Sequence, residues 1–144
     1  MMDFVDVVEF KMKKLLLTIL FISTLFAEHG TTNDKDLQLA LQGKYSEAFK
    51  GFKKRCELND GYACGMVAYF YNKGFSVQKD IKKAIKYYKK GCNLNDSDSC
   101  TILGYYYYKG NLVKKDLKKA ITLLKKACEK LKNKDACNYL KNIH

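Results

Sequence analysis

The chain of 144 residues lacks proline and tryptophan altogether and has only nine glycines. The tight turns of a β-sandwich rely on glycine and proline, so their scarcity argues against an all-β fold. Proline is also the strongest helix breaker, whereas the abundant lysine is well tolerated in helices. Apolar residues make up 47% of the chain, which is ordinary for a globular protein. The composition therefore favours a single, ordered, helical domain.

A hydrophobic run long enough to span a membrane is also missing. The most hydrophobic segment, residues 15–26, is shorter than the roughly 20 residues that a transmembrane helix needs. Lys13 and Lys14 precede this segment and Ala27 follows it, which is the order found in a secretory signal peptide. The pattern predicts that residues 1–27 are removed, with an uncleaved membrane anchor as the alternative.

The mature protein is then expected to be a repeat domain of residues 28–144, secreted or periplasmic and without a stable membrane anchor. Met12 is the expected true start, because residues 1–10 carry three acidic side chains and fit no signal-peptide n-region. No cysteine directly follows the hydrophobic segment, so a lipid anchor is not predicted.

Acidic residues are few relative to basic ones, with 15 Asp and Glu against 27 Lys and Arg, and the formal net charge is +12. Such a charge attracts anionic surfaces. Lysines at helical spacing, however, usually form the solvated face of an amphipathic helix. Expected export and the lack of a recognition motif argue against nucleic acid as a partner.

Histidine is scarce too, since only His29 and His144 occur, both near the chain ends. Zinc ligands usually lie two to four residues apart, whereas seven or eight residues separate the cysteines of each close pair. The C-x-x-C motif of redox-active pairs is absent. The sequence therefore predicts neither a metal site nor a cofactor.

What the chain does contain is a repeat of 36 residues. The first cysteine of each pair recurs every 36 residues, at Cys56, Cys92 and Cys128. The second cysteines are Cys64, Cys100 and Cys137, and the last interval is 37 residues, so we expect one extra residue in the last turn. Each pair spans a turn between two expected helices, where cysteines can approach closely enough to be bridged. Six cysteines allow fifteen connectivities, and the equivalence of the units favours local ones. The predicted disulfides are Cys56–Cys64, Cys92–Cys100 and Cys128–Cys137.

Each unit has the pattern of two helices. Ile81, Ala84, Ile85 and Tyr88 follow the i, i+3, i+4, i+7 spacing of one apolar helix face. The expected helices cover residues 34–42, 45–58, 61–73, 80–94, 97–109, 116–131 and 134–142. Asp80 and Asp116 are the expected N-caps, and Gly74 and Gly110 are expected at helix ends. The short polar turns that start the other helices contain Asp60, Asp96 and Asn133.

Small residues recur at matching positions, where we expect one helix to cross its neighbour closely. On one helix of each unit they are Ala48, Ala84 and Ala120, and on the partner helix they are Ala68 and Gly104. Glycine inside a helix costs roughly 1 kcal/mol relative to alanine, so Gly104 is expected to permit a close contact.

These repeats resemble the Sel1-like repeat, a relative of the tetratricopeptide repeat, over about residues 35–142. The residues that match its pattern in order are Leu103-Gly104, Tyr107, Gly110, Val113, Asp116 and Lys119-Ala120. Departures are Ala68 for glycine, Tyr87 for tryptophan and a truncated last unit. The cysteines in this register are similar to those of Helicobacter cysteine-rich proteins. The resemblance implies an all-α, α/α superhelical solenoid of about three repeats stapled by disulfides.

The resemblance implies two different classes of function. Sel1-like repeats act mostly as protein-interaction scaffolds, whereas cysteine-rich members are similar to penicillin-binding proteins and slow β-lactamases. Ser76 and Lys79 form the S-x-x-K pattern of serine β-lactamases, but K-T-G is absent and Leu112 takes the place of Ser76 in the next repeat. We therefore expect a scaffold that binds proteins or peptides, including cell-wall or β-lactam-like ligands. A slow β-lactamase or penicillin-binding hydrolase is the alternative.

A solenoid of helix pairs presents a concave surface that the first helix of each pair lines. That helix is rich in tyrosine here, and tyrosine offers a large contact area at low entropic cost. Tyr71 and Tyr107 match the packing position of the family and are expected in the core. We expect the chain to be a monomer whose partner is a protein or a peptide. The candidate groove residues are Tyr69, Asn72, Tyr105 and Tyr108.

Overall fold

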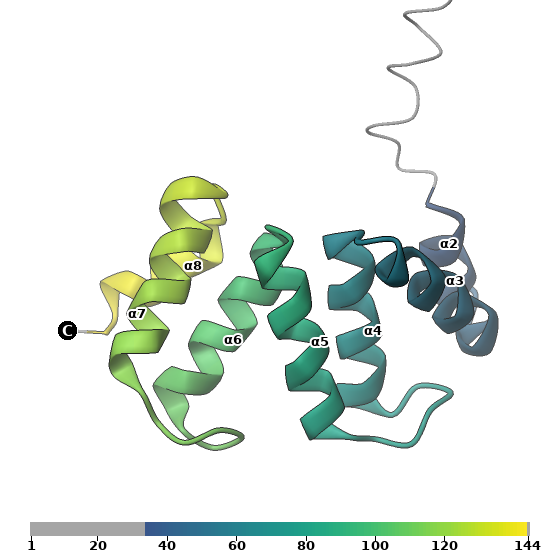
Figure 1. Ribbon diagram of the computed structural model, residues 1–144, viewed down its shortest axis with the longest axis horizontal. Helices are drawn as coiled ribbons and strands as arrows, with labels where there is room; N and C mark the ends of the chain where they lie inside the picture. The colour runs from purple at the N-terminus through teal and green to yellow at the C-terminus, as the bar shows by residue number, and fades with distance from the viewer. Residues whose placement is uncertain (1–33, 144) are drawn as a thin grey trace, which may run out of the picture. The chain divides into compact units, whose positions relative to one another are not determined.

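The computed structural model describes residues 34–143, coloured along the chain in Figure 1. The expected signal peptide and Met12 lie outside this range. The described residues form helices and contain no strand. In chain order the elements are α2 (Lys35–Leu41), α3 (Tyr45–Glu57), α4 (Gly61–Lys73), α5 (Ile81–Asn93), α6 (Ser97–Lys109), α7 (Leu117–Lys125), the π-helical turn η1 (Lys126–Lys130) and α8 (Lys134–Lys141).

Each helix packs against the next one along the chain (Figure 1). Beyond these sequential contacts, α4 also touches α6, and α6 touches α8. The first helices of successive units therefore lie next to one another, which is the arrangement of an α/α solenoid. The predicted fold class is confirmed.

The helix ends follow the predicted capping chemistry. The two expected N-caps, Asp80 and Asp116, each accept a hydrogen bond from the backbone N–H three residues further on, at 2.9 Å. The polar turns provide the same cap to the other helices at 2.9–3.0 Å, through Asp60, Asp96 and Asn133. The backbone of Gly74 and Gly110 has φ values of +78° and +71°, directly after α4 and α6. A side chain at these two positions would be strained, which explains why glycine ends both helices.

One expected helix differs from the structure. The pattern predicts an uninterrupted helix over residues 116–131, whereas α7 ends at Lys125 and continues as the π-helical turn η1. A π turn takes up one residue more than an α turn. The extra residue of the last unit is therefore accommodated within the helix rather than in the turn that follows it.

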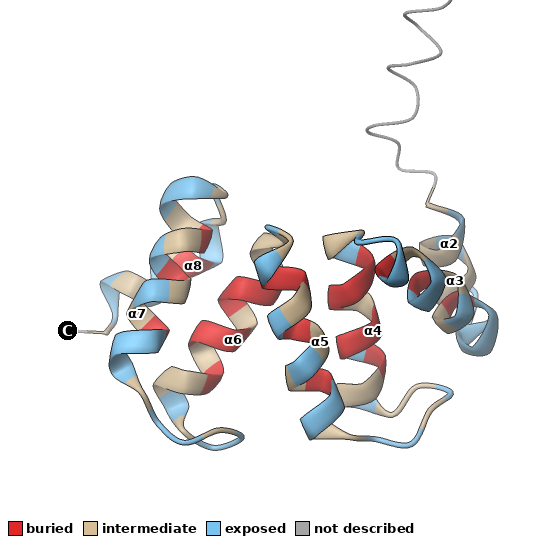
Figure 2. Ribbon diagram, viewed as in Figure 1, coloured by how far each residue is buried: buried red, intermediate tan, exposed pale blue. Residues whose placement is uncertain are grey.

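The core consists of apolar side chains that face neighbouring helices, as the buried segments in Figure 2 show. Phe52, Val67 and Phe70 are buried between α3 and α4, and Tyr88, Leu103 and Leu124 are buried among the later helices. The rings of Tyr71 and Tyr87 stack at 5.8 Å between centroids and contact both groups of core residues. The repeats thus share one continuous apolar interior.

The expected small residues lie at close helix contacts. Ala48, Ala84 and Ala120, on α3, α5 and α7, are all at most 1% exposed. A Cβ atom added to Gly104 would lie 2.7 Å from Cγ of Leu124 and 3.3 Å from the carbonyl oxygen of Ala120. Only glycine fits at this crossing of α6 and α7.

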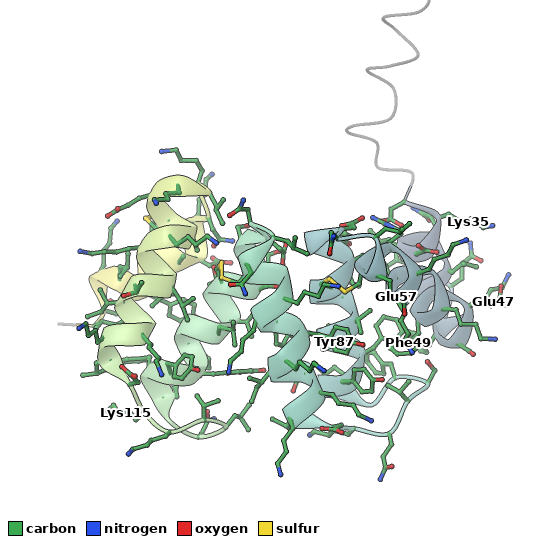
Figure 3. The ribbon with its side chains drawn as sticks, in the orientation of Figure 1. Lys35, Glu47, Phe49, Glu57, Tyr87 and Lys115 are labelled. Carbon is green, nitrogen blue, oxygen red and sulfur yellow. A yellow bond between two sulfur atoms is a disulfide. The ribbon has the colours of Figure 1, made fainter. Side chains whose placement is uncertain are left out.

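Each predicted cysteine pair forms a disulfide in the structure, shown by the yellow bonds in Figure 3. The bridges join α3 to α4, α5 to α6 and η1 to α8, with Cα–Cα distances of 4.6, 4.6 and 4.8 Å. Chain-entropy arguments give about 2.5 kcal/mol of stabilisation for each loop of this length.

Lysine side chains reinforce the same joints between units. The ammonium of Lys90 donates a hydrogen bond to the carbonyl oxygen of Cys56 at 2.8 Å, and Lys126 does the same to Cys92 at 2.6 Å. Both acceptors lie in the last turn of a helix, where a positive charge interacts favourably with the helix dipole. Each lysine therefore ties its own helix to the corresponding helix of the preceding unit.

We expect Gly104→Leu to lower the free energy of unfolding by about 2 kcal/mol or more, because the new side chain overlaps Leu124 and cannot be accommodated without a shift of α7. Chemical denaturation of the oxidised protein measures this. The control is Lys118→Leu, which adds leucine at an exposed position of α7. Equal midpoints for Gly104→Leu and the parent would contradict the close crossing.

Replacing Lys90 by methionine keeps most of the aliphatic stem but removes the charged donor to Cys56. The expected loss is about 1 kcal/mol, since hydrogen bonds from charged groups are stronger than neutral ones and this lysine is partly exposed. Lys89→Met changes the exposed neighbouring lysine and serves as the control. The prediction fails if the two variants unfold at the same denaturant concentration.

Candidate functional site

Helices α4, α6 and α8 line a groove with a volume of about 470 Å³, to which α5 contributes one side chain. Five of the eleven lining residues are tyrosines, so we call this surface the tyrosine groove. Its lining residues are Tyr69, Asn72, Lys73, Tyr88, Asp98, Thr101, Ile102, Tyr105, Tyr106, Asp135 and Tyr139.

Three of the four expected groove residues come together in it. Tyr69 and Asn72 project from α4, and Tyr105 projects from the equivalent place on α6. Tyr108 does not line the groove. The wall formed by α8 reaches Tyr105, whose ring lies 5.3 Å from that of Tyr139, but α8 is eight residues long against thirteen for α6. Tyr108, in the last turn of α6, therefore lies beyond the wall.

Two buried tyrosines form the floor of the groove, and neither is among the groove residues expected from the sequence. Tyr88 was expected only on the apolar face of its helix. Tyr88 is 1% exposed and Tyr106 is 8% exposed. Burial raises the pKa of both hydroxyl groups. A hydrogen bond with the side chain of Asn72 lowers the pKa of each, but less than burial raises it. Because both tyrosines stay neutral at physiological pH, the floor presents uncharged hydrogen-bonding groups. By contrast, Tyr71 and Tyr107, expected in the core, are only partly buried.

Tyr139 is a further lining residue outside the expected set, and it belongs to the truncated last unit. It aligns with Met66 and Ile102 once the extra residue of the last unit is counted. Extending the repeat alignment through this residue would have identified its position on the inner face of α8.

Charge is distributed unevenly along the groove. Asp98 and Asp135 lie in the first turns of α6 and α8, where a negative charge suits the helix dipole. Lys73 lies in the last turn of α4, with its ammonium group 5.7 Å from the ring centroid of Tyr69. One end of the groove is therefore acidic and the other basic.

Most of the excess positive charge lies on other helices. Helix α5 carries five lysines and no acidic residue, and α7 carries three lysines and no acidic residue. These lysines alternate with the buried apolar positions of both helices. They form the solvated face that the sequence pattern predicted.

The S-x-x-K residues do not line the tyrosine groove. Ser76 and Lys79 are exposed in the loop between α4 and α5, outside any helix, and Ser76 has a φ of +56°. No hydrogen bond joins the two side chains among the described residues. A serine nucleophile needs a base within hydrogen-bond reach, and this loop does not provide one.

Within residues 34–143, no group of three or more histidine, cysteine, aspartate or glutamate side chains is placed to hold a metal ion. No helix in the same range is long and apolar enough to cross a membrane.

Comparison with known proteins agrees with this geometry. The Sel1 repeat family matches residues 61–96 and 97–130. Among solved structures, Helicobacter pylori cysteine rich protein B is 45% identical, with a TM-score of 0.62 over 66% of this chain and 71% of that chain. No curated protein sequence matches at a significant level.

Two more distant structures share the fold. A Sel1 repeat protein from Oxalobacter formigenes is 24% identical, with a TM-score of 0.67 over 74% of this chain and 43% of that chain. The protein c5321, a protective antigen of uropathogenic Escherichia coli with an SLR fold, is 24% identical, with a TM-score of 0.54 over 57% of this chain and 18% of that one.

The helix pairs, their capped ends and the aromatic inner groove define an α/α solenoid of the tetratricopeptide-like class. Within this class, the 36-residue register and the three disulfides identify the family. The chain belongs to the Sel1-like repeat family, in its cysteine-rich branch.

We expect that the purified oxidised protein hydrolyses nitrocefin no faster in its parent form than as Ser76→Ala, because Ser76 has no base beside it. Hydrolysis is followed by the colour change of the substrate, with buffer and a known serine β-lactamase as references. Turnover that exceeds buffer and disappears in Ser76→Ala would contradict this reading of the loop.

Proposed function

We propose that the protein is a binding scaffold whose tyrosine groove holds an extended peptide segment of a partner protein. The observation that carries the proposal is the convergence of Tyr69, Asn72 and Tyr105 from successive repeats on one groove. Equivalent side chains from successive repeats are regularly spaced along the groove. This spacing suits an extended polypeptide, whose backbone groups and side chains also recur at regular intervals. Sel1-like repeats in general mediate protein–protein interactions, which supports the same class of partner.

The chemistry of the groove suits a peptide. Tyrosine rings cover the apolar parts of a ligand, while the Asn72 amide and the neutral hydroxyls of Tyr88 and Tyr106 match backbone N–H and C=O groups. The acidic and basic ends provide different partners for charged side chains and so favour one direction of binding.

Rigidity supports the same role. The disulfides and the lysine bonds fix successive units relative to one another, so little conformational freedom is lost when a ligand binds.

We also propose that the chain acts outside the cytoplasm, in the periplasm or the medium, after cleavage near Ala27. Support comes from its three disulfides, which persist in oxidising compartments.

Peptides selected from a random short-peptide library on the oxidised protein should bind the parent at least about tenfold more tightly than Tyr105→Ala, because the variant removes a central aromatic wall of the groove. Isothermal titration calorimetry measures the affinities, and circular dichroism verifies folding. The matched control is Tyr108→Ala, the same change on the same helix outside the groove. The proposal fails if both variants bind the peptides like the parent, or if selection yields no binding peptide.

A further inference from the structure

The first residues of α4, α6 and α8 can be compared directly, because they occupy equivalent places in successive units. Their N-caps are Asp60, Asp96 and Asn133, and all three accept the same backbone hydrogen bond at 2.9–3.0 Å. The three positions differ in how charge is balanced around the cap.

The first unit neutralises its cap within the chain. Arg55 donates to Asp60 through both Nε and a terminal nitrogen, at 2.9 and 2.7 Å. The residues equivalent to Arg55 in the next two units are Gly91 and Ala127, neither of which can supply a charge. The third unit needs none, because its cap is the neutral Asn133.

Only the middle unit therefore keeps a charged cap without a cation. No lysine or arginine of the described residues forms an ion pair with Asp96. This is unusual in a chain of net charge +12. The burial of Asp96 raises its pKa, a shift that an adjacent cation would reverse.

A second polar group, fully buried, lies beside Asp96. Ser99 takes the place held by alanine in the other two units, and it is 0% exposed. Its hydroxyl makes no hydrogen bond of good geometry among the described residues, and the Asp96 carboxylate, whose pKa it lowers, is the acceptor beside it. A Cβ atom added to Gly65 would lie 2.7 Å from Oδ2 of Asp96 and 2.8 Å from Oγ of Ser99, so both oxygens face the same place on α4.

Both residues line a pocket of about 160 Å³ between α4 and α6. Its walls are mainly aromatic and apolar, with contributions from Tyr62, Tyr69, Tyr88, Met66 and Ile102, and Asp98 stands beside it. Four of these side chains, Tyr69, Tyr88, Asp98 and Ile102, also line the tyrosine groove. The pocket is thus a side chamber of the groove.

Two cations lie near the walls, and both have other interactions. Arg55 is 6.0 Å from the ring centroid of Tyr62 and is bound to Asp60 and Asp36. Lys73 lies over the ring of Tyr69 and lines the groove rather than the pocket.

Carboxylates combined with tyrosine rings bind an alkylammonium group, because the carboxylate neutralises the charge while the rings hold the methylene groups and attract the cation. A hydrated metal ion would need more oxygen ligands than this pocket offers, and an anion would be repelled. We propose that the pocket receives the side chain of a lysine residue from a peptide in the tyrosine groove, with its ammonium donating to Asp96 at the floor beside Ser99. The peptide origin of the lysine rests on the function proposed above.

The test uses Nα-acetyl-lysine amide, titrated into the oxidised full-length protein and followed by NMR chemical shifts. The parent should bind it with shifts at residues of α4 and α6, and Asp96→Asn should weaken binding at least about tenfold. This variant keeps its cap, because asparagine caps α8 in the same way. Asp116→Asn, the same change at the exposed cap of α7, should leave the affinity unchanged. Nα-acetyl-norleucine amide, which lacks the ammonium, should not bind.

Equal binding of acetyl-lysine amide by the parent and Asp96→Asn, or no binding by the parent, would overturn the pocket. Tighter binding of cadaverine than of acetyl-lysine amide would assign the pocket to a free amine and overturn the peptide origin. The two proposals fail separately. If library peptides bind the parent and Asp96→Asn equally but do not bind Tyr105→Ala, the groove is supported and the pocket is not. If acetyl-lysine amide binds but the library yields no binding peptide, the pocket is supported and the groove is not.

Discussion

The covalent joint between units is the constraint on which the rest of this structure depends. A disulfide and a lysine hydrogen bond meet at the end of one helix, where Cys56 or Cys92 provides both the sulfur and the acceptor carbonyl. A chain with so few repeats buries a limited core, so these joints supply stability that a longer solenoid obtains by stacking. They also set the place of each first helix, and thereby the spacing of the side chains along the groove.

Much of the architecture was readable from the sequence because its determinants are local. Asp80 and Gly74 cap helices through contacts within a few residues, and the cysteine period selects the pairings. The π turn was not readable, because the extra residue could be placed anywhere between Cys128 and Cys137. Its location depends on which backbone distortion keeps the last disulfide at the same separation as the other two.

The site was less predictable for a geometric reason. Tyr105 and Tyr108 have similar patterns in the sequence, yet only Tyr105 meets a wall, since α8 stops short of the last turn of α6. The importance of Asp96 emerges only when its neighbours in space are compared between units. Arg55 and Gly91 are five residues before their caps, and nothing in the sequence alone shows that this position faces the cap.

The left-handed residues Asn59, Asn95 and Lys132 give the bridged turns one further property. Each is exposed at the tip of its turn, the kind of site where a protease cuts a folded chain. A cut at any of the three leaves its two sides joined by the adjacent disulfide, so the nicked protein stays in one piece. The loops around Ser76 and Leu112 have no such bridge. In a compartment rich in proteases, a cut at either loop, or at the unbridged turn around Gly43, therefore separates the chain into two pieces.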